Sequence, residues 1–194
     1  MVANLKDLPR RHYTLEEYFA LERVGDARYE YWDGDIVCMS GGTRRHYLIS
    51  ERLRSKLTAL LSGRPCEAFS GSVPIKTPSL PPYRYPDLSV VCGELQFEEI
   101  NGIDALLNPI LIVEVLSPGT ELLDRNQKRD AYQSLSSMQE YLLIAQDEPH
   151  ITQFVREGNG WRRSDFSDFQ GAIELSSINC RLTLSDIYDG ITFN

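Results

Sequence analysis

Residues 108–132 read NPILIVEVLSPGTELLDRNQKRDAY, and the rest of the chain can be interpreted outward from this stretch. Residues 110–116 are all apolar except Glu114. A run of this length that is rich in Ile, Leu and Val predicts a strand buried on both faces of a sheet. An unpaired ionised carboxylate is very costly there, so Glu114 is expected to be neutral, paired or bound to a cation.

The residues after this strand predict a break and then a polar helix. The sequence Ser-Pro-Gly at 117–119 ends the strand. Asp124, Lys128 and Tyr132 then recur at i, i+4 and i+8, so they share one face of a helix. In isolation, Asp124 and Lys128 are best interpreted as a helical salt bridge. Beside Glu114, the same lysine indicates a metal-dependent active site at the end of the strand.

Length and composition are those of an ordinary globular protein. The 194 residues, 42% hydrophobic and 25% charged, predict a single domain over residues 1–194, with a loose basic arm at residues 1–12. No apolar run is long enough to span a membrane, and the N-terminus lacks the apolar core of a signal peptide. We therefore expect a cytoplasmic protein that does not contact membranes.

The cysteines and the net charge exclude some classes of protein. Four cysteines lie far apart without a CxxC pair: Cys38, Cys66, Cys92 and Cys180. This spacing predicts reduced, mostly buried thiols rather than disulfides or zinc ligands. The net charge of −8 weighs against non-specific coating of nucleic acid, which depends on Lys and Arg. It does not exclude a nuclease, because metal-binding acids lower the total charge.

The first half of the chain predicts helix, hairpin, helix and strands. Thr14–Glu17 reads as a capping box. Asp-Gly-Asp at 33–35 predicts a hairpin between residues 29–32, which include Glu30, and residues 36–39. A long helix is predicted from residue 43 to about Leu61, with His46 one turn inside it. Its buried face is expected to comprise Ile49, Leu53, Leu57 and Leu60, opposite a basic face with Arg44, Arg45, Arg52, Arg54 and Lys56.

The second half predicts mostly strands. Residues 67–76 are expected to form a strand bent at Gly71, and Asp87 follows Pro86 at the entry to a buried strand. Residues 93–107 are expected to be an acidic connection that is variable in structure. Further strands are expected at residues 140–145, 151–156, 161–166 and 181–184, with a turn at 186–190. This order predicts an α/β domain with a mixed central sheet and one main crossover helix.

Asp87, Glu114 and Lys128 form the sharpest candidate site. Two carboxylates about one strand apart can hold one or two hard divalent cations. The metal can polarise a phosphodiester and lower the pKa of bound water, and a lysine can orient that water or neutralise developing charge. The structural alternatives are that Asp87 caps a strand and that Glu114 lies in a buried ion pair.

Together these residues resemble the PD-(D/E)xK nuclease superfamily, and more closely its Uma-type family of restriction endonucleases. The PD and ExK letters alone are weak signals, but the connected pattern EVLSPxT…D…K…Y at residues 114–132 is specific. The resemblance covers nearly the whole chain. It also includes residues 29–35, His46, residues 85–91, Glu140-Tyr141 and residues 187–190.

The resemblance implies a restriction-endonuclease-like α/β core, with a mixed central β-sheet flanked by helices, and Mg²⁺-dependent cleavage of nucleic acid, with Mn²⁺ as a substitute. Asp87 and Glu114 would be the metal ligands, with the backbone carbonyl of Val115 as a third oxygen. Glu30 matches an early acidic position of the family and would complete the site. The lysine expected two residues after the glutamate is replaced by Leu116, so Lys128 is the candidate amine.

Three further residues are possible supports of this site. Asp124 lies next to Lys128 in the pattern. His46 could touch a phosphate or assist a proton transfer, or it could be structural. Tyr132 could donate a hydrogen bond in the site or pack in the core.

The expected partner is nucleic acid, with DNA favoured, and a homodimer would suit cleavage of both strands of a duplex. The alternative is an inactive binding module on the same fold, which the absent ExK lysine and the acidic charge favour slightly. Hydrolysis of another phosphoester is a third option, because the same metal chemistry would serve it.

Overall fold

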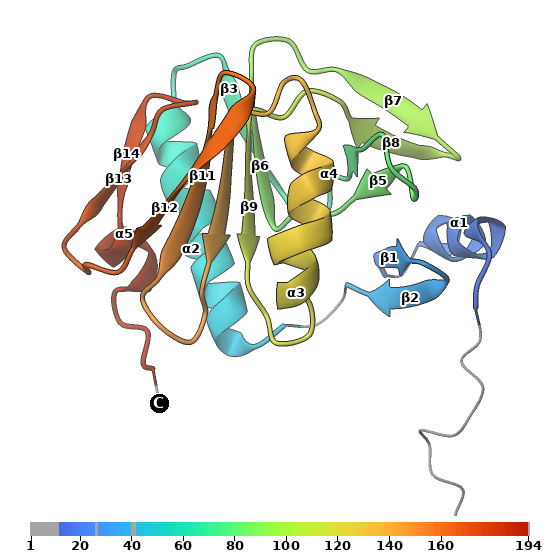
Figure 1. Ribbon diagram of the computed structural model, residues 1–194, viewed down its shortest axis with the longest axis horizontal. Coiled ribbons are helices and arrows are strands. Elements are labelled where there is room, and N and C mark those ends of the chain that lie inside the picture. Colours follow the sequence, from blue (N-terminus) through green and yellow to red (C-terminus); the bar gives the residue numbers. More distant parts are fainter. Residues whose placement is uncertain (1–11, 26, 40–41, 194) are drawn as a thin grey trace, which may run out of the picture.

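The computed structural model describes residues 12–25, 27–39 and 42–193 (Figure 1). The arm expected at residues 1–12 therefore lies outside the described residues, apart from His12. Among the described helices, none is both long and apolar enough to cross a membrane.

A six-stranded sheet forms the centre of the molecule, in the order β12-β11-β10-β9-β6-β3. Strands β9 and β10 are parallel and the other neighbours are antiparallel, which confirms the expected mixed sheet. All five residues of β9 are buried, as the apolar run predicts. The strands are β3 (Cys66–Ser70), β6 (Leu88–Cys92), β9 (Leu111–Val115), β10 (Glu140–Ile144), β11 (Ile151–Glu157) and β12 (Gly160–Phe166).

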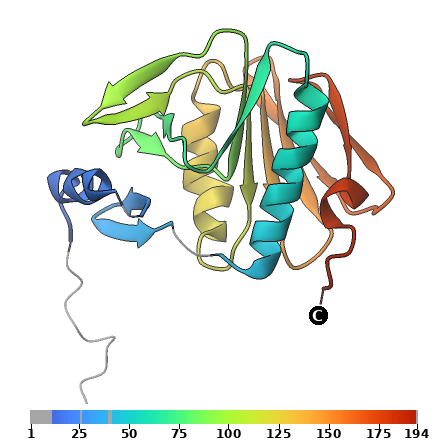
Figure 2. The ribbon, with the colours of Figure 1, turned by 180° about the vertical axis from the view of Figure 1, so that it is seen from behind.

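Helices cover both faces of this sheet (Figures 1 and 2). One face carries α2 (Arg44–Leu61), which begins at the cap residue Thr43. The other face carries a helix made of α3 (Glu121–Leu123), the π-helical turn η2 (Asp124–Lys128) and α4 (Arg129–Gln133). The helix predicted after the 117–119 break is therefore confirmed, but its centre is π-helical rather than regular α.

Alternation along β9 assigns its side chains to two cores. Leu111, Val113 and Val115 pack in the cluster that contains the buried face of α2, whereas Ile112 packs with Tyr132 on the opposite side. Because successive strand residues point to opposite faces, Glu114 points to the side of η2 and α4. The buried residues of α2 are Ile49, Leu53, Leu57 and Leu61, with the predicted Leu60 partly buried.

Two smaller units complete the fold beside the sheet. The N-terminal unit comprises α1 (Leu15–Val24), with the predicted capping box, and the hairpin β1 (Tyr29–Trp32) and β2 (Asp35–Cys38). Its aromatic side chains pack on a four-stranded sheet, which comprises β4 (Ile75–Lys76), β5 (Tyr83–Arg84), β7 (Phe97–Ile100) and β8 (Ile103–Leu106). Next to α2 lie β13 (Ala172–Leu175), β14 (Cys180–Thr183) and α5 (Leu184–Tyr188).

The acidic connection expected at residues 93–107 contains the β7–β8 hairpin, which was not predicted. Its turn is Asn101-Gly102, with φ of 53° and 84°. Asn-Gly is a strong hairpin signal, which the acidic composition of this segment obscured. The strand expected at residues 67–76 also divides, since β3 and β4 belong to different sheets. Strand β13 was not predicted.

The prediction of four reduced thiols was also wrong, because Cys66 and Cys92 form a disulfide. The two residues face each other across the antiparallel β3–β6 pair, with Cα atoms 4.0 Å apart. Their proximity depends on the register of two strands, which cysteine spacing alone does not show. Cys180 is buried and Cys38 is exposed, both outside the disulfide.

Thiol titration will therefore distinguish the two cysteines of the disulfide from the two cysteines outside it. In denaturant without reductant, two thiols per chain should react, and four should react after reduction. Because the disulfide closes a loop across 26 positions, its reduction is expected to lower the free energy of unfolding by about 3 kcal/mol. Chemical denaturation with and without reductant measures this change. Four reactive thiols before reduction would contradict the pairing.

Candidate active site

Asp87 and Glu114 lie side by side because β6 and β9 are neighbouring strands. Asp87 directly precedes β6, as predicted, and Glu114 is the fourth residue of β9. The backbone N–H of Val115 donates to Asp87 Oδ2 at 2.6 Å, and the N–H of Asp87 donates to Glu114 Oε2 at 3.3 Å. Each carboxylate is therefore held by the backbone next to the other one.

Lys128 reaches this pair from η2 and is 1% exposed. Its Nζ lies 3.0 Å from Glu114 Oε1, 3.2 Å from Glu30 Oε1 and 3.4 Å from Asp124 Oδ1. It also donates to the carbonyl of Tyr85 at 3.0 Å. The sequence prediction that the following helix brings a lysine next to Glu114 thus agrees with the geometry, and Asp124 and Lys128 do contact each other.

Burial and the neighbouring charges have opposite effects on the pKa values of this cluster. Burial raises the pKa of Glu114 well above its ordinary value, although Lys128 acts to lower it. Burial also raises the pKa of Asp124. Burial acts to lower the pKa of Lys128, but its carboxylate partners outweigh this effect and raise the pKa well above the ordinary value. The ammonium therefore stays charged, and it faces more carboxylates than it can neutralise.

Glu30 is held on all sides by hydrogen-bond donors. Its Oε1 accepts the N–H of Tyr85 at 3.1 Å, and its Oε2 accepts the indole N–H of Trp32 at 3.2 Å. Together with Lys128, these contacts leave the side chain 1% exposed. Neither Glu30 nor Asp124 lines the cavity that Asp87 and Glu114 border. The position of Glu30 is that of a residue that fixes Lys128 from the N-terminal hairpin.

A cavity of about 120 Å³ is lined by Asp87 and Glu114. Its lining includes Val115, Lys128 and His46. His46 Nε2 lies 3.3 Å from Asp87 Oδ1, and in the described part of the chain its Nδ1 has no hydrogen-bond partner. Burial acts to lower the pKa of His46, but the hydrogen bond and charge of Asp87 outweigh this effect and raise it.

The oxygen donors around this cavity have the chemistry that suits a hard divalent cation. Asp87 and Glu114 supply carboxylates, and Val115, whose backbone carbonyl was expected as a third oxygen ligand, also lines the cavity. Within the described ranges, no three His, Cys, Asp or Glu side chains converge on a common metal position. A cation here would therefore complete its coordination with water, as Mg²⁺ commonly does. The excess of carboxylates over the single ammonium also favours a cation.

Tyr132 is part of the core and not of the hydrogen-bonding network. It is fully buried beside Tyr141, and in the described part of the chain its hydroxyl has no hydrogen-bond partner. Tyr141 instead donates to the backbone carbonyl of Asp124 at 2.9 Å. Of the two roles open for Tyr132, the structure matches core packing.

Tyr132→Phe is therefore expected to leave the free energy of unfolding unchanged or to raise it by about 1 kcal/mol, because an unpaired buried hydroxyl is removed. Chemical denaturation of the variant and the unaltered chain measures the difference. Tyr141→Phe, which removes a hydroxyl that does donate, should lower stability. A Tyr132→Phe variant that is clearly less stable than the unaltered chain would show that the hydroxyl has a partner.

Several contacts of the site were not predicted from sequence. The Tyr85 carbonyl is a backbone group and carries no side-chain signal. Thr120 donates to Asp124 Oδ2 at 2.8 Å and contacts Ser117 at 2.9 Å. These two residues are part of the family pattern, and nothing else in the sequence indicated that they belong to the site. Trp32 was recognisable only as an aromatic neighbour of Glu30 in an alternating strand.

Comparison with known proteins places this chain in a family. The family model Uma2, described as "Putative restriction endonuclease", matches residues 15–185. The uncharacterized protein slr1290 of Synechocystis sp. is 31% identical over 194 residues, which cover 100% of both chains. The uncharacterized protein sll1609 of the same organism is 29% identical over 164 residues, covering 84% of this chain and 92% of that protein.

A solved structure shares the fold. It is the crystal structure of a "putative nuclease belonging to DUF820" from Anabaena variabilis, with a TM-score of 0.69 and 20% sequence identity. The match covers 91% of this chain and 97% of the other. The expected restriction-endonuclease-like α/β fold is therefore confirmed. Since the family model spans most of the chain, this protein belongs to the Uma2 family of restriction-endonuclease-like nucleases.

Proposed function

We propose that this protein is a Mg²⁺-dependent endonuclease that hydrolyses phosphodiester bonds in DNA, with Mn²⁺ as a substitute. The observation that carries the proposal is the contact of 3.0 Å between Lys128 Nζ and Glu114 Oε1. Leu116 occupies the position where the PD-(D/E)xK pattern expects its lysine, and Lys128 brings an amine to the same carboxylate from the next helix.

Each residue has a proposed role in this reaction. Asp87, Glu114 and the carbonyl of Val115 would hold the cation, which supplies charge to polarise the phosphodiester and to acidify water. Lys128 would orient the attacking water and offset charge that builds on the phosphate. His46 faces the same cavity and would act on a phosphate oxygen or on the leaving group as a proton donor. Glu30 and Asp124 would position Lys128.

Nicking of supercoiled plasmid tests the proposal. The chain is incubated with Mg²⁺, Mn²⁺ or EDTA, next to Asp87→Asn and to Asp104→Asn, an exposed acid on β8. We expect metal-dependent nicking by the unaltered chain and by Asp104→Asn, and no nicking by Asp87→Asn or in EDTA. Nicking that persists in EDTA would contradict the metal dependence, and nicking by Asp87→Asn would contradict its role.

The alternative is a binding module that has kept the acids without catalysis. One observation favours it: no three candidate side chains in the described residues converge on a metal. Thermal unfolding with increasing Mn²⁺ discriminates between the two functions. A metal site raises the unfolding temperature as the metal concentration exceeds the dissociation constant, whereas a purely structural acid cluster does not.

We also propose that the protein acts as a homodimer, because two active sites related by a two-fold axis can cleave both strands of a duplex. Light scattering after size-exclusion chromatography measures the mass in solution. A monomer that nicks one strand at a time would contradict this part of the proposal.

A further inference from the structure

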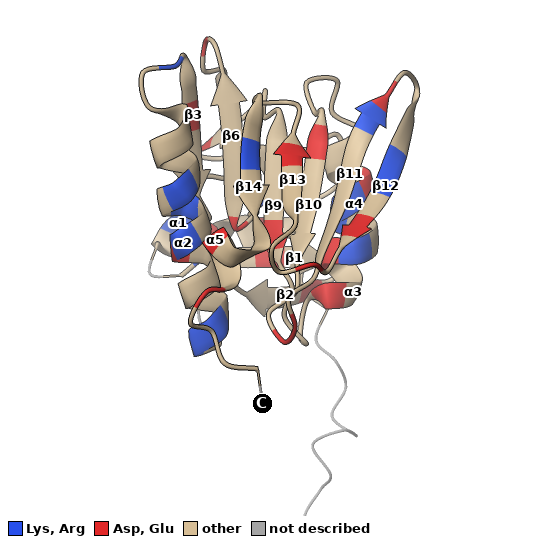
Figure 3. Ribbon diagram, turned by 90° about the vertical axis from the view of Figure 1, so that its left-hand side faces the viewer, with Lys and Arg blue, Asp and Glu red and all other residues tan. Residues whose placement is uncertain are grey.

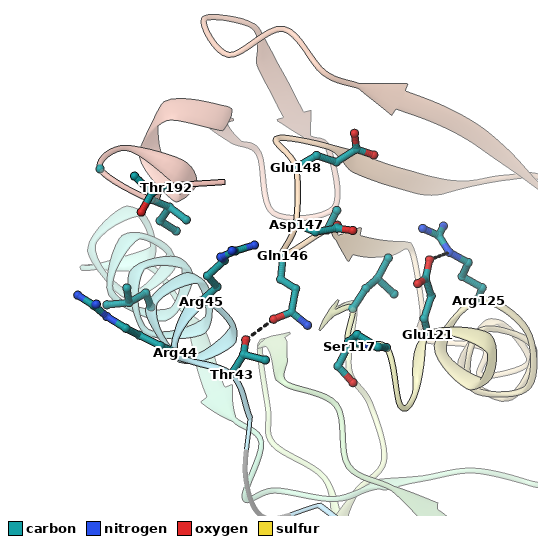
Figure 4. Close-up of a pocket in the computed structure, with 16 residues that line it drawn as sticks. Thr43, Arg44, Arg45, Ser117, Glu121, Arg125, Gln146, Asp147, Glu148 and Thr192 are labelled. Carbon is teal, nitrogen blue, oxygen red and sulfur yellow. Dashed lines mark hydrogen bonds and ion pairs between the residues drawn. The ribbon is translucent and has the colours of Figure 1, made fainter. Parts of the chain in front are cut away.

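A second, larger cavity adjoins the candidate active site. It has a volume of about 580 Å³ and lies between the first turn of α2, the loop after β9 and the loop after β10 (Figure 4). This volume is within the range of about 300–1,000 Å³ that is typical of small-molecule sites. Ser117 lines both cavities. A nucleic-acid strand bound at Asp87 and Glu114 could therefore continue into the larger cavity.

Gln146 is the residue that points to a ligand. It follows β10, lines the larger cavity and is 7% exposed. Its Oε1 accepts a hydrogen bond from the hydroxyl of Thr43, while its Nε2 has no partner among the residues that the structure describes. Figure 4 shows this nitrogen turned away from Thr43 and toward Ser117. A buried donor without an acceptor is unfavourable unless a ligand supplies one.

The α2 side of the cavity is suited to an anion. Thr43 caps this 18-residue helix by accepting the N–H of His46, and the first turn contains no acidic residue. Arg44 and Arg45 line the cavity there, and neither forms an ion pair within the described ranges. Figure 3 shows basic residues along α2. Helix N-termini and arginines together favour phosphate.

The side of the larger cavity opposite α2 carries acidic residues. Asp147 and Glu148 line it with carboxylates, and Figure 4 shows the guanidinium of Arg45 turned toward Gln146 and Asp147, whereas that of Arg44 is turned away from them. Carboxylates accept hydrogen bonds from amino groups at the edges of nucleobases, as in contacts to N4 of cytosine. Leu48 and Ile191 also line the cavity and provide apolar surface. The cavity therefore combines a basic side that suits an anion, the unpaired amide N–H of Gln146, and a side with hydrogen-bond acceptors.

We propose that this cavity binds one nucleotide of the substrate strand next to the scissile phosphate. The phosphate of that nucleotide lies at Arg45 and the start of α2, and its base lies against Gln146 and Asp147. This inference deepens the proposed function and rests on it, since it assigns a nucleotide-recognition site to the same enzyme. It makes Gln146 and Asp147 determinants of which base is preferred beside the cleavage point.

An NMR titration of the full chain in EDTA tests the proposal without cleavage. The probes are the four deoxynucleoside 5′-monophosphates and inorganic phosphate. We expect saturable shifts of the Gln146 side-chain amide and of the first-turn amides of α2, with at least one nucleotide binding about tenfold more tightly than phosphate. Equal affinity for phosphate, or no shift of Gln146, would overturn the proposal.

Matched variants make the test specific. Arg45→Gln should weaken nucleotide binding about tenfold. Arg54→Gln, on the same helix but outside the cavity and paired with Glu51 at 3.0 Å, should change it less than about twofold. Gln146→Leu should weaken binding and reduce the differences among the four bases. Equal losses in the two arginine variants would indicate a general charge effect and overturn the assignment.

These experiments distinguish a failure of the nucleotide-site proposal from a failure of the endonuclease proposal. If plasmid is nicked but no nucleotide shifts Gln146, the nucleotide site is wrong and the endonuclease stands. If nucleotides bind as described but plasmid is not nicked with any metal, the catalytic proposal is wrong and the nucleotide site stands as part of a binding module.

Discussion

Replacing Lys128 with methionine is expected to lower the free energy of unfolding by about 3–5 kcal/mol near pH 7.5 and to abolish nicking. The lysine is 1% exposed and contacts Glu30, Glu114 and Asp124 within 3.4 Å. Without it, these carboxylates stay buried with no cation to offset them. Chemical denaturation measures the loss of stability, and the plasmid assay measures the loss of activity.

The pH dependence of this loss has a definite sign. Burial raises the pKa of Glu114 in the folded chain, above about 4.3 in the unfolded chain. A raised folded pKa gives stability that is present at low pH and is lost as pH rises through the folded value. The Lys128→Met variant should therefore approach the stability of the unaltered chain as pH falls, because its carboxylates become protonated, and should differ most at neutral and alkaline pH.

Lys76→Met is the matched control for this prediction. Lys76 also pairs with a glutamate, Glu98, but both side chains are substantially exposed. Exposed pairs of this kind contribute about 0–1 kcal/mol. If Lys128→Met were as stable as Lys76→Met across the pH range, the buried ion-pair network would not exist as described.

Replacing Glu114 with glutamine should abolish both nicking and stabilisation by metal. We expect activity to fall by more than the roughly 100-fold that loss of an outer-shell partner costs a metal site. For the unaltered chain, Mn²⁺ at 100 times its dissociation constant should add about 2.7 kcal/mol of stability, whereas the variant should gain almost none. Differential scanning calorimetry over a Mn²⁺ series, with the plasmid assay in parallel, measures both effects.

Glu140→Gln is the control for the effect of removing a buried carboxylate that is not a proposed metal ligand. Glu140 lies on the neighbouring strand β10 and is fully buried, but it bonds to Ser177 and Gln153 rather than to Lys128. Its variant should keep the stabilisation by Mn²⁺ and the nicking activity even if its own stability falls. A Glu114→Gln variant that still gains stability with Mn²⁺ would show that the cation binds elsewhere.

The elements that sequence could predict are those with a strong local pattern. The apolar run of β9, the spacing of Ile49, Leu53 and Leu57 in α2, and the Asp33-Gly34 turn each depend on residues close in sequence. The proximity of Asp87 and Glu114 depends instead on how the strands pair. Asp87 precedes β6 and Glu114 lies near the end of β9, and the two residues meet because these strands are antiparallel neighbours.

The features that could not be predicted depend on register and on tertiary contacts. The Cys66–Cys92 disulfide requires the alignment of β3 with β6. The π-helical turn at η2 has no local signature of its own, although such turns are frequent at functional sites. The fixed position of Glu30 requires Trp32 and the backbone of Tyr85, which lies in a distant part of the chain.

The attachment of Glu30 to the N-terminal hairpin has a consequence for the motions of the native state. The hairpin is not a strand of the central sheet, so it can separate from the body in a local opening that leaves the sheet intact. Each opening would deprive Lys128 of one carboxylate and would expose the amide of Tyr85, which donates to Glu30. Hydrogen exchange at that single amide therefore reports how often the amine of the site is released.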